Sequence, residues 1–190
     1  MPGRARPMPE RPLPRMKSWR ALLVAALVAY GGQPVHADAV QEYTAKSVLA
    51  LNLARYTEWP PEAFKDGGTT LSLCVLGDEV VQQAFALIDK KQVGGRILSV
   101  RGTDDGRHLD PCQLLYVSAD AENTALLFEE SRKRHILTIG ETEDFLAQGG
   151  MVYLEMADPK INLHVNLDAT QKAGVRISAR VLKLAIIFKP

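Results

Sequence analysis

The sequence predicts an α/β domain in which a mostly parallel sheet has helices on both faces and an antiparallel hairpin at one edge. Short apolar segments of strand length alternate with longer segments of helical period. Short connections separate these segments, which is typical of a parallel sheet built from strand–helix units. Near the C-terminus two strand-like segments flank Asp158-Pro159, a dipeptide that favours a tight turn and hence a hairpin.

Residues 1–37 are expected to lie outside this domain. Their start is rich in Pro and Arg, and after Met16 two basic residues precede an apolar run over residues 21–29. Val35-His36-Ala37 then offers a small-residue cleavage site, so the pattern is that of a cleaved export signal. A transmembrane anchor is the alternative, but a span needs roughly 20 apolar residues. We expect Met16 to be the true start and residues 38–190 to form one exported domain.

The charge of this domain argues against nucleic acid as a partner. The whole chain has 23 Lys+Arg and 22 Asp+Glu; residues 1–37 hold six and one of these, which leaves 17 and 21 and a net charge of −4. A protein that binds nucleic acid needs a basic patch. The longest basic run, residues 132–134, is expected to end a helix, where cations complement the helix dipole.

Two helices and a strand are expected in the first part of the domain. Residues 38–56 place apolar side chains at helical spacing. Two prolines follow Trp59 and bar further helix, and we expect Trp59 to pack the helix end onto the core; a ligand platform is the alternative. Residues 71–76 are expected to form a strand, and residues 79–90 a helix that Asp78 caps.

The middle of the chain repeats the alternation of strands and helices. The expected segments are, in order, a strand (96–100), a strand (113–118), a helix (119–133), a strand (135–139) and a short helix (141–148). Thr142 is placed to cap the short helix. Gly149-Gly150 is expected to end it, because glycine reaches positive φ without a Cβ clash.

Alternation along the two hairpin strands, residues 151–156 and 161–166, places Tyr153, Glu155 and His164 on one face of the sheet. Exposed aromatic side chains beside polar ones are frequent in protein contacts. This face is therefore a candidate contact surface, and an ordinary solvated sheet face is the alternative.

Residues 168–188 are expected to form a last, amphipathic helix that turns Arg176 and Arg180 outward. Gly174 inside such a helix costs roughly 1 kcal/mol relative to Ala. A kink, or a Gly-centred turn between two helices, is therefore the alternative. The apolar end of the chain, which includes Phe188, is either core or a contact patch.

No arrangement of residues indicates catalysis or metal binding. The histidines of the domain are widely separated, and the sequence has no H-x-x-x-H, C-x-x-C or G-x-S-x-G motif. We expect no enzyme activity, no metal and no cofactor.

The two cysteines, Cys74 and Cys112, each lie at an expected strand. In an exported protein a lone pair usually forms a disulfide, and only one connectivity exists. A C-x-x-C motif, which would depress a thiol pKa, is absent. We expect the pair to staple the fold, and a redox switch is the alternative.

Four stretches, taken together and in this order, carry a resemblance: LNLARYTEWP (51–60), CVLGD (74–78) with CQLLYVS (112–118), ILTIGETEDFLAQGGMVYLEM (136–156) and INLHVNLDATQKAGVRISARVLKLA (161–185). They resemble the YfiR-like family of small periplasmic proteins. The resemblance implies a Rossmann-like three-layer α/β domain, often dimeric, in the periplasm. It also implies that Cys74 and Cys112 match a family disulfide, whereas further cysteines of some members are replaced here by Ala147 and Leu154.

The resemblance further implies a repressor. Members hold the periplasmic sensor region of an inner-membrane diguanylate cyclase in an off state. An outer-membrane lipoprotein can sequester them, which releases cyclic-di-GMP synthesis and favours biofilm. For this chain we expect the same two partners and a homodimer.

The partner contact is expected to combine the hairpin, the last helix and the C-terminus, through Tyr153, Glu155, His164, Arg176, Arg180 and Phe188. Arg55 and Trp59, from the first-helix motif, are the second choice. The alternative function is binding or sensing of a small ligand in the crevice at the strand ends, near Gly77, Asp78 and Gly140.

Overall fold

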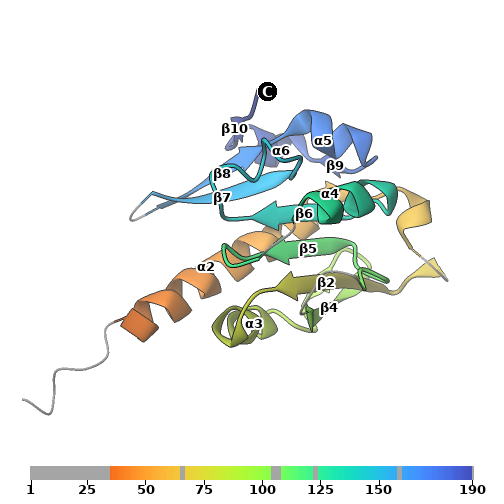
Figure 1. Ribbon diagram of the computed structural model, residues 1–190. Coiled ribbons are helices and arrows are strands. Elements are labelled where there is room, and N and C mark those ends of the chain that lie inside the picture. The colour runs from red at the N-terminus through yellow and green to blue at the C-terminus, as the bar shows by residue number, and fades with distance from the viewer. Residues whose placement is uncertain (1–34, 65–66, 104–107, 122–123, 158–159, 190) are drawn as a thin grey trace, which may run out of the picture. The chain divides into compact units, whose positions relative to one another are not determined.

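The computed structural model describes residues 35–64, 67–103, 108–121, 124–157 and 160–189. Its strands are β1 (Thr57–Glu58), β2 (Thr70–Leu76), β3 (Gln92–Val93), β4 (Arg96–Thr103), β5 (Leu114–Val117), β6 (Leu137–Gly140), β7 (Val152–Ala157), β8 (Lys160–Val165), β9 (Arg176–Ile177) and β10 (Ile186–Ile187). Its helices are α2 (Val35–Arg55), α3 (Glu79–Ala86), α4 (Thr124–Lys133), α5 (Leu167–Lys172), α6 (Ala179–Leu182) and the 3-10 helix η1 (Pro61–Ala63) (Figure 1). The predicted export signal falls almost wholly on residues 1–34, outside the described residues.

Eight strands form one mixed sheet in the order β10-β8-β7-β6-β5-β2-β4-β3, and β1 pairs with β9 in a separate two-stranded sheet. Parallel pairs join β2 to β4 and β5, β5 to β6, β6 to β7, and β8 to β10. Antiparallel pairs join β3 to β4 and β7 to β8. The α/β class and the antiparallel C-terminal hairpin are confirmed, and β10 lies beyond that hairpin at the edge of the sheet.

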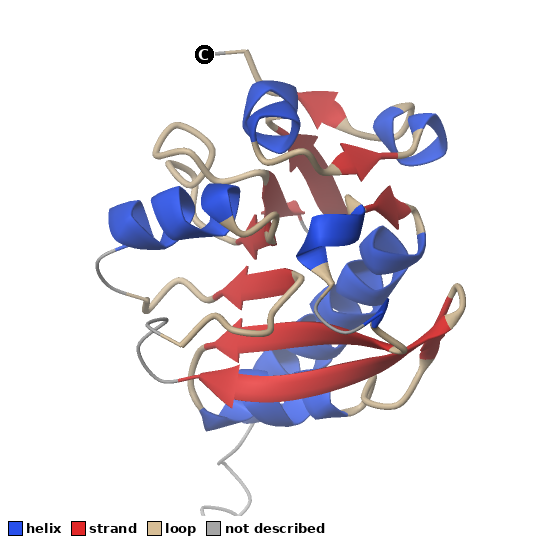
Figure 2. Cartoon of the chain, turned by 90° about the vertical axis from the view of Figure 1, so that its right-hand side faces the viewer, coloured by secondary structure: helices blue, strands red, loops and turns tan. Residues whose placement is uncertain are grey.

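Alternate side chains of β2 enter two different core clusters, because successive side chains of a strand point to opposite faces. Leu73 and Val75 belong to the first cluster, together with apolar residues of α2 and α3. Leu76 belongs to the second cluster, together with Leu127 and Phe128 of α4. Figure 2 shows helices lying against the strands.

Helix α2 forms where the sequence predicts it and ends at the expected place. The backbone N–H of Tyr56 closes the last turn on Asn52 O (3.2 Å), and the chain then enters β1. The indole N–H of Trp59 donates to Gln113 O (3.0 Å), and its ring packs against the first core cluster. The packing role predicted for Trp59 is confirmed. Among the described residues, no helix has both the length and the apolar character that crossing a bilayer requires.

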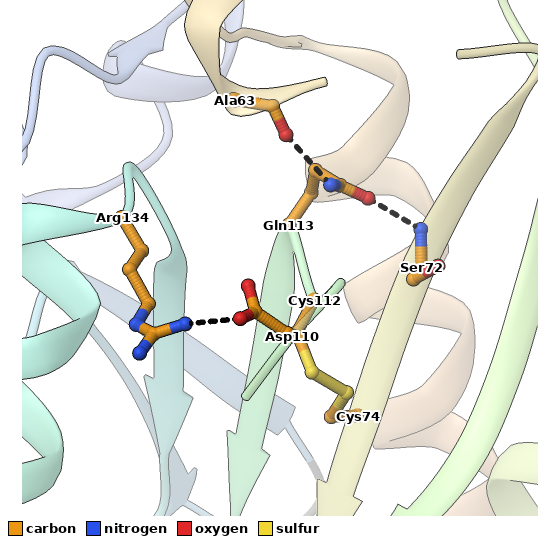
Figure 3. Close-up of a disulfide and its surroundings, with 7 residues drawn as sticks. All are labelled: Ala63, Ser72, Cys74, Asp110, Cys112, Gln113 and Arg134. Atoms are coloured by element: carbon orange, nitrogen blue, oxygen red, sulfur yellow. Dashed lines mark hydrogen bonds and ion pairs between the residues drawn. A yellow bond between two sulfur atoms is a disulfide. The ribbon is translucent and has the colours of Figure 1, made fainter. Parts of the chain in front are cut away.

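A disulfide joins Cys74 of β2 to Cys112, which directly precedes β5 (Figure 3). Their Cα atoms are 5.8 Å apart, and the two residues are only 2% and 4% exposed. The adjacent Gln113 is buried and adds a second link: its Oε1 accepts from Ser72 N and its Nε2 donates to Ala63 O, each at 2.8 Å. The start of β5 is thereby fixed both to β2 and to the segment that follows α2.

The prediction of a single helix over residues 168–188 is wrong, and the alternative, a Gly-centred turn between two helices, is confirmed at Gly174. The chain there forms α5, β9, α6 and β10 in succession. Gly174 has φ +69, in the left-handed region that glycine adopts readily, and Ala173 O lies 2.7 Å from His135 Nδ1. Beyond this turn Ile177 pairs with Thr57 of β1. Tertiary strand pairing therefore overrides the helical spacing of the apolar residues.

The short helix predicted over residues 141–148 is also wrong, and the segment is a series of turns. The ring of Phe145 explains the tight path: a Cβ on Gly140 or on Gly150 would lie 2.3 Å from it. Thr142 acts in a turn, in which its carbonyl accepts from Phe145 N (3.1 Å). The glycines on either side therefore serve the close packing of one aromatic ring.

Candidate functional site

The register of the β7–β8 pair sets side chains of both strands on a common face. Tyr153 lies opposite His164, and Glu155 lies opposite Asn162. Directly opposed residues of an antiparallel pair point to the same side of the sheet. We call the surface of Tyr153, Glu155, Asn162, His164 and Phe188 the hairpin face. The shared face predicted for Tyr153, Glu155 and His164 is confirmed as geometry.

The polar groups of the hairpin face are bonded to one another. Glu155 Oε2 accepts from Asn162 Nδ2 at 2.9 Å and lies 2.9 Å from His164 Nε2. These two contacts stabilise the carboxylate and lower the pKa of Glu155, and the hydrogen bond from Asn162 has the larger effect. Side chains held in this way lose less conformational freedom when a partner binds.

The aromatic rings of the hairpin face lie close together, and that of Tyr153 is partly buried. The rings of Tyr153 and His164 have centroids 5.2 Å apart and planes inclined by 32°. Tyr153 packs against the second core cluster. The pKa of its phenol is raised, mainly by this burial and next by the nearby Glu155 carboxylate. The side chains of His164 and Glu155 remain 20% and 38% exposed. A partner could therefore reach both an aromatic edge and a carboxylate.

Phe188 reaches the same surface by a route that the sequence does not reveal. Because β10 pairs parallel to β8, with Ile186 opposite His164, the C-terminal segment runs beside the hairpin. The backbone N–H of Phe188 donates to Val165 O at 2.9 Å. Its ring packs, as Tyr153 does, against the second core cluster.

The structure does not bring the two predicted arginines to the hairpin face. Arg176 lies in β9, opposite Glu58 of β1. Arg180 lies on α6, whose inner residues Val181 and Leu182 pack against the first core cluster. The break in the expected helix is the reason, because it sends this segment along another side of the domain.

The second-choice residues, Arg55 and Trp59, differ in their exposure. Arg55 is exposed at the end of α2 and donates to Asn52 Oδ1 at 3.4 Å. Trp59 is half-buried and committed to Gln113, as described above. Of this pair, Arg55 is the more exposed side chain.

A buried ionic cluster is the feature that sequence reasoning missed. The side chains of Lys46 on α2 and Glu141 after β6 are 3% and 4% exposed and form an ion pair, and Lys46 also pairs with Glu42 at 2.5 Å. Glu141 further accepts from Tyr116 OH (3.0 Å) and Tyr43 OH (3.3 Å). The pKa of both tyrosines is raised, mainly because their hydroxyls are buried and next because the Glu141 carboxylate is close.

This cluster anchors α2 to the carboxyl ends of β5 and β6. The backbone N–H of Ala119 donates to Glu141 Oε1 at 2.8 Å and completes the set of donors around that carboxylate. The only sequence signal is the helical i, i+4 spacing of Glu42 and Lys46, which indicates an ordinary surface pair. The cluster stabilises the fold and leaves no room for a ligand at Glu141, since that carboxylate already accepts from the chain's own donors.

The strand-end positions considered for a small ligand are filled by the chain itself. A Cβ on Gly77 would lie 3.0 Å from Val81 and 3.1 Å from Ser118. The Asp78 carboxylate accepts from Val81 N at 3.0 Å, which confirms it as the cap of α3. Gly140 lies under the Phe145 ring. Within the ranges that the structure describes, no group of three or more His, Cys, Asp or Glu is placed to hold a metal ion.

Solved structures similar to the chain include a conserved domain protein from Vibrio cholerae O1 biovar El Tor (TM-score 0.46, 11% identity, 77% of this chain). Another is an ABC domain in complex with L-Trp from Streptococcus pneumoniae (TM-score 0.44, 12% identity, 73% of this chain). The chain spans 60% of the length of each of these proteins. At these values the likeness carries no argument about function.

A family model described as YfiR/HmsC-like (DUF4154) matches residues 43–186. The match begins within α2 and ends in β10, so it contains the disulfide, the buried ionic cluster except Glu42, and the hairpin face except Phe188. This match agrees with the resemblance that the four sequence stretches carry. The chain therefore belongs to the YfiR/HmsC-like family.

Proposed function

We propose that this protein is a periplasmic regulator of cyclic-di-GMP signalling that restrains an inner-membrane diguanylate cyclase by contact with the periplasmic sensor region of that enzyme. Membership of the YfiR/HmsC-like family supports the regulatory role and the periplasmic location. The predicted export signal supports the same location. The proposal that it represses a cyclase rests on the resemblance together with the hairpin face.

The hairpin face is the observation that carries this proposal. It combines a tilted Tyr153–His164 ring pair with the Glu155 carboxylate, and Asn162 helps to hold that carboxylate in place. Aromatic residues are enriched in the cores of protein interfaces, and tyrosine gives a large contact at a low cost in conformational entropy. A partly exposed and internally bonded surface of this kind supports binding of a protein.

We propose a homodimer and sequestration by an outer-membrane lipoprotein, and a role that needs no catalysis and no cofactor. Within the same proposal the domain is a Rossmann-like three-layer sandwich with a mostly parallel sheet. Five parallel strand pairs and the apolar residues that helices contribute to both core clusters support this architecture.

Cellular cyclic-di-GMP tests the proposal. The measurement compares the native bacterium with a strain that lacks this gene and with the same strain after the gene is restored from Met16. We expect cyclic-di-GMP to rise on deletion and to return on restoration. An unchanged level in the deletion strain would contradict repression of a cyclase.

A further inference from the structure

The last part of the chain concentrates positive charge. After Asp168 the sequence has five basic residues and no acidic one, although residues 38–190 carry a net charge of −4. Lys172 is paired with Asp168 at 2.7 Å, and Arg176 faces Glu58 across the β1–β9 pair. Three basic residues follow, and we call them, together with the exposed aliphatic residues between them, the basic edge: Arg180, Lys183, Leu184, Ile186, Ile187 and Lys189.

The fold turns the basic edge outward. On the turn formed by α6 and the residues after it, Val181, Leu182 and Ala185 pack against the first core cluster. Arg180, Lys183 and Leu184 have i, i+3, i+4 spacing, so they share the opposite side. Among the ion pairs that join described residues, none involves Arg180, Lys183 or Lys189.

Aliphatic side chains lie between these cations. Leu184 is 85% exposed, and Ile186 and Ile187 of the edge strand β10 are 51% and 37% exposed. Lys183 precedes this apolar stretch and Lys189 follows it. Figure 1 shows α6 and β10 together beside β8, at the edge of the sheet.

This composition fits a lipid surface better than a protein. Cores of protein interfaces are depleted of lysine, and their main energetic contacts are Trp, Tyr and Arg. The basic edge has two lysines, one arginine and no exposed aromatic residue, since Phe188 packs against the second core cluster. Aliphatic side chains that enter the boundary between headgroups and acyl chains, with cations beside the lipid phosphates, are the usual pattern of interfacial binding.

We infer that the basic edge docks on an anionic lipid surface. Leu184 and Ile187, which lies opposite Val165 on the side of the sheet that α6 covers, enter the headgroup boundary. Arg180, Lys183 and Lys189 lie against the lipid phosphates. Near such a surface each cation strengthens binding about fivefold. The net negative charge of the domain does not prevent this, because charges more than about 10 Å from the surface are screened at physiological salt. The docking goes beyond the proposed regulatory function and does not depend on it.

Sedimentation with vesicles tests this inference. The exported protein, purified from cells, is mixed with vesicles of pure phosphatidylcholine or with vesicles in which about a third of the lipid is phosphatidylglycerol. We expect binding to the anionic vesicles only, and we expect added salt to weaken it. Equal binding to both vesicle types, or no binding to the anionic ones, would overturn the inference.

Matched variants locate the surface. Lys183→Glu reverses one charge on the basic edge, and we expect it to weaken binding to the anionic vesicles about tenfold or more. Leu184→Asn is expected to weaken binding with no change in charge. Lys133→Glu makes the same charge change on α4, where Lys133 pairs with Glu129 at 2.8 Å, and it is expected to leave binding unchanged. All three side chains are exposed, and melting temperatures check that each variant folds.

Two results would contradict the assignment to this edge. One is an equal loss of vesicle binding in the Lys133→Glu and Lys183→Glu variants. The other is normal vesicle binding by Lys183→Glu combined with loss of its effect on cyclic-di-GMP, which would assign the edge to a protein partner. Because vesicle binding and cyclic-di-GMP are measured separately, failure of this inference is distinguishable from failure of the proposed function.

Discussion

Glu155 and His164 lie on neighbouring strands of the hairpin, with the carboxylate Oε2 of one 2.9 Å from the ring Nε2 of the other. Their positions follow from the register of the β7–β8 pair, in which Glu155 faces Asn162 and His164 faces Tyr153. The contact fixes the orientation of the imidazole against the Tyr153 ring. The contact surface that we propose is therefore ordered before any partner binds.

The Glu155 carboxylate is expected to make stability depend on acid pH. Its pKa lies below the ordinary value of 4.5, so it contributes stability above that pH and loses the contribution as the pH falls through the lowered pKa. Wild type should therefore exceed Glu155→Gln in melting temperature at about pH 5, and the margin should shrink as the pH falls further. Asn162→Ala removes the first donor and should move this change to higher pH.

Lys46 is expected to be the most sensitive charged position of α2. Its ammonium is buried against Glu141, and loss of one partner leaves a buried charge without its counterion. Lys46→Met should lower the free energy of unfolding by about 3 kcal/mol. Lys133→Met, on the exposed side of α4, should change it by less than about 0.5 kcal/mol. Urea denaturation of both variants gives the comparison, and equal effects would contradict the anchoring role.

The disulfide is expected to stabilise the fold without regulating it. It closes a loop with a sequence separation of 38 residues, for which the chain-entropy model gives about 4 kcal/mol. The double variant Cys74→Ala, Cys112→Ala should lose stability of this order in urea denaturation. Both sulfurs are buried, so the native protein should resist reduction by dithiothreitol. A disulfide that is reduced faster than the protein unfolds would indicate a redox switch instead.

Gly174 is expected to be required for the turn that separates α5 from β9. At its φ of +69 any other L-residue is strained, so Gly174→Ala should lower the free energy of unfolding by about 1–2 kcal/mol. Gly95→Ala is the matched control, because that glycine has open space around its Cβ position and no positive φ. If thermal denaturation shows equal effects of the two substitutions, the turn is not the cause.

The sequence predicts the parts of the fold that depend on local patterns. Helix α2, the strands of the parallel sheet and the hairpin follow from apolar periodicity and turn residues, and alternation places Tyr153, Glu155 and His164 together. The prediction of a single last helix is wrong because Ile177 pairs with Thr57, a residue far away in the sequence. The pairing of Lys46 with Glu141, 95 residues apart, likewise has no local signal. For the same reason the separation of Arg176 from the hairpin could not be foreseen, whereas Phe188 does lie beside the hairpin with which it is grouped in the predicted contact.

The most direct test of the central claim is cellular cyclic-di-GMP in the gene-deletion strain restored with hairpin-face variants. Tyr153→Glu and His164→Glu place a new charge on the hairpin face. Leu126→Glu is the control, because it places the same charge on α4, where Leu126 is an apolar residue that is 72% exposed. With periplasmic levels and melting temperatures matched, we predict that the control restores repression and the hairpin variants leave cyclic-di-GMP high. Normal repression by both hairpin variants would contradict the hairpin face as the regulatory contact.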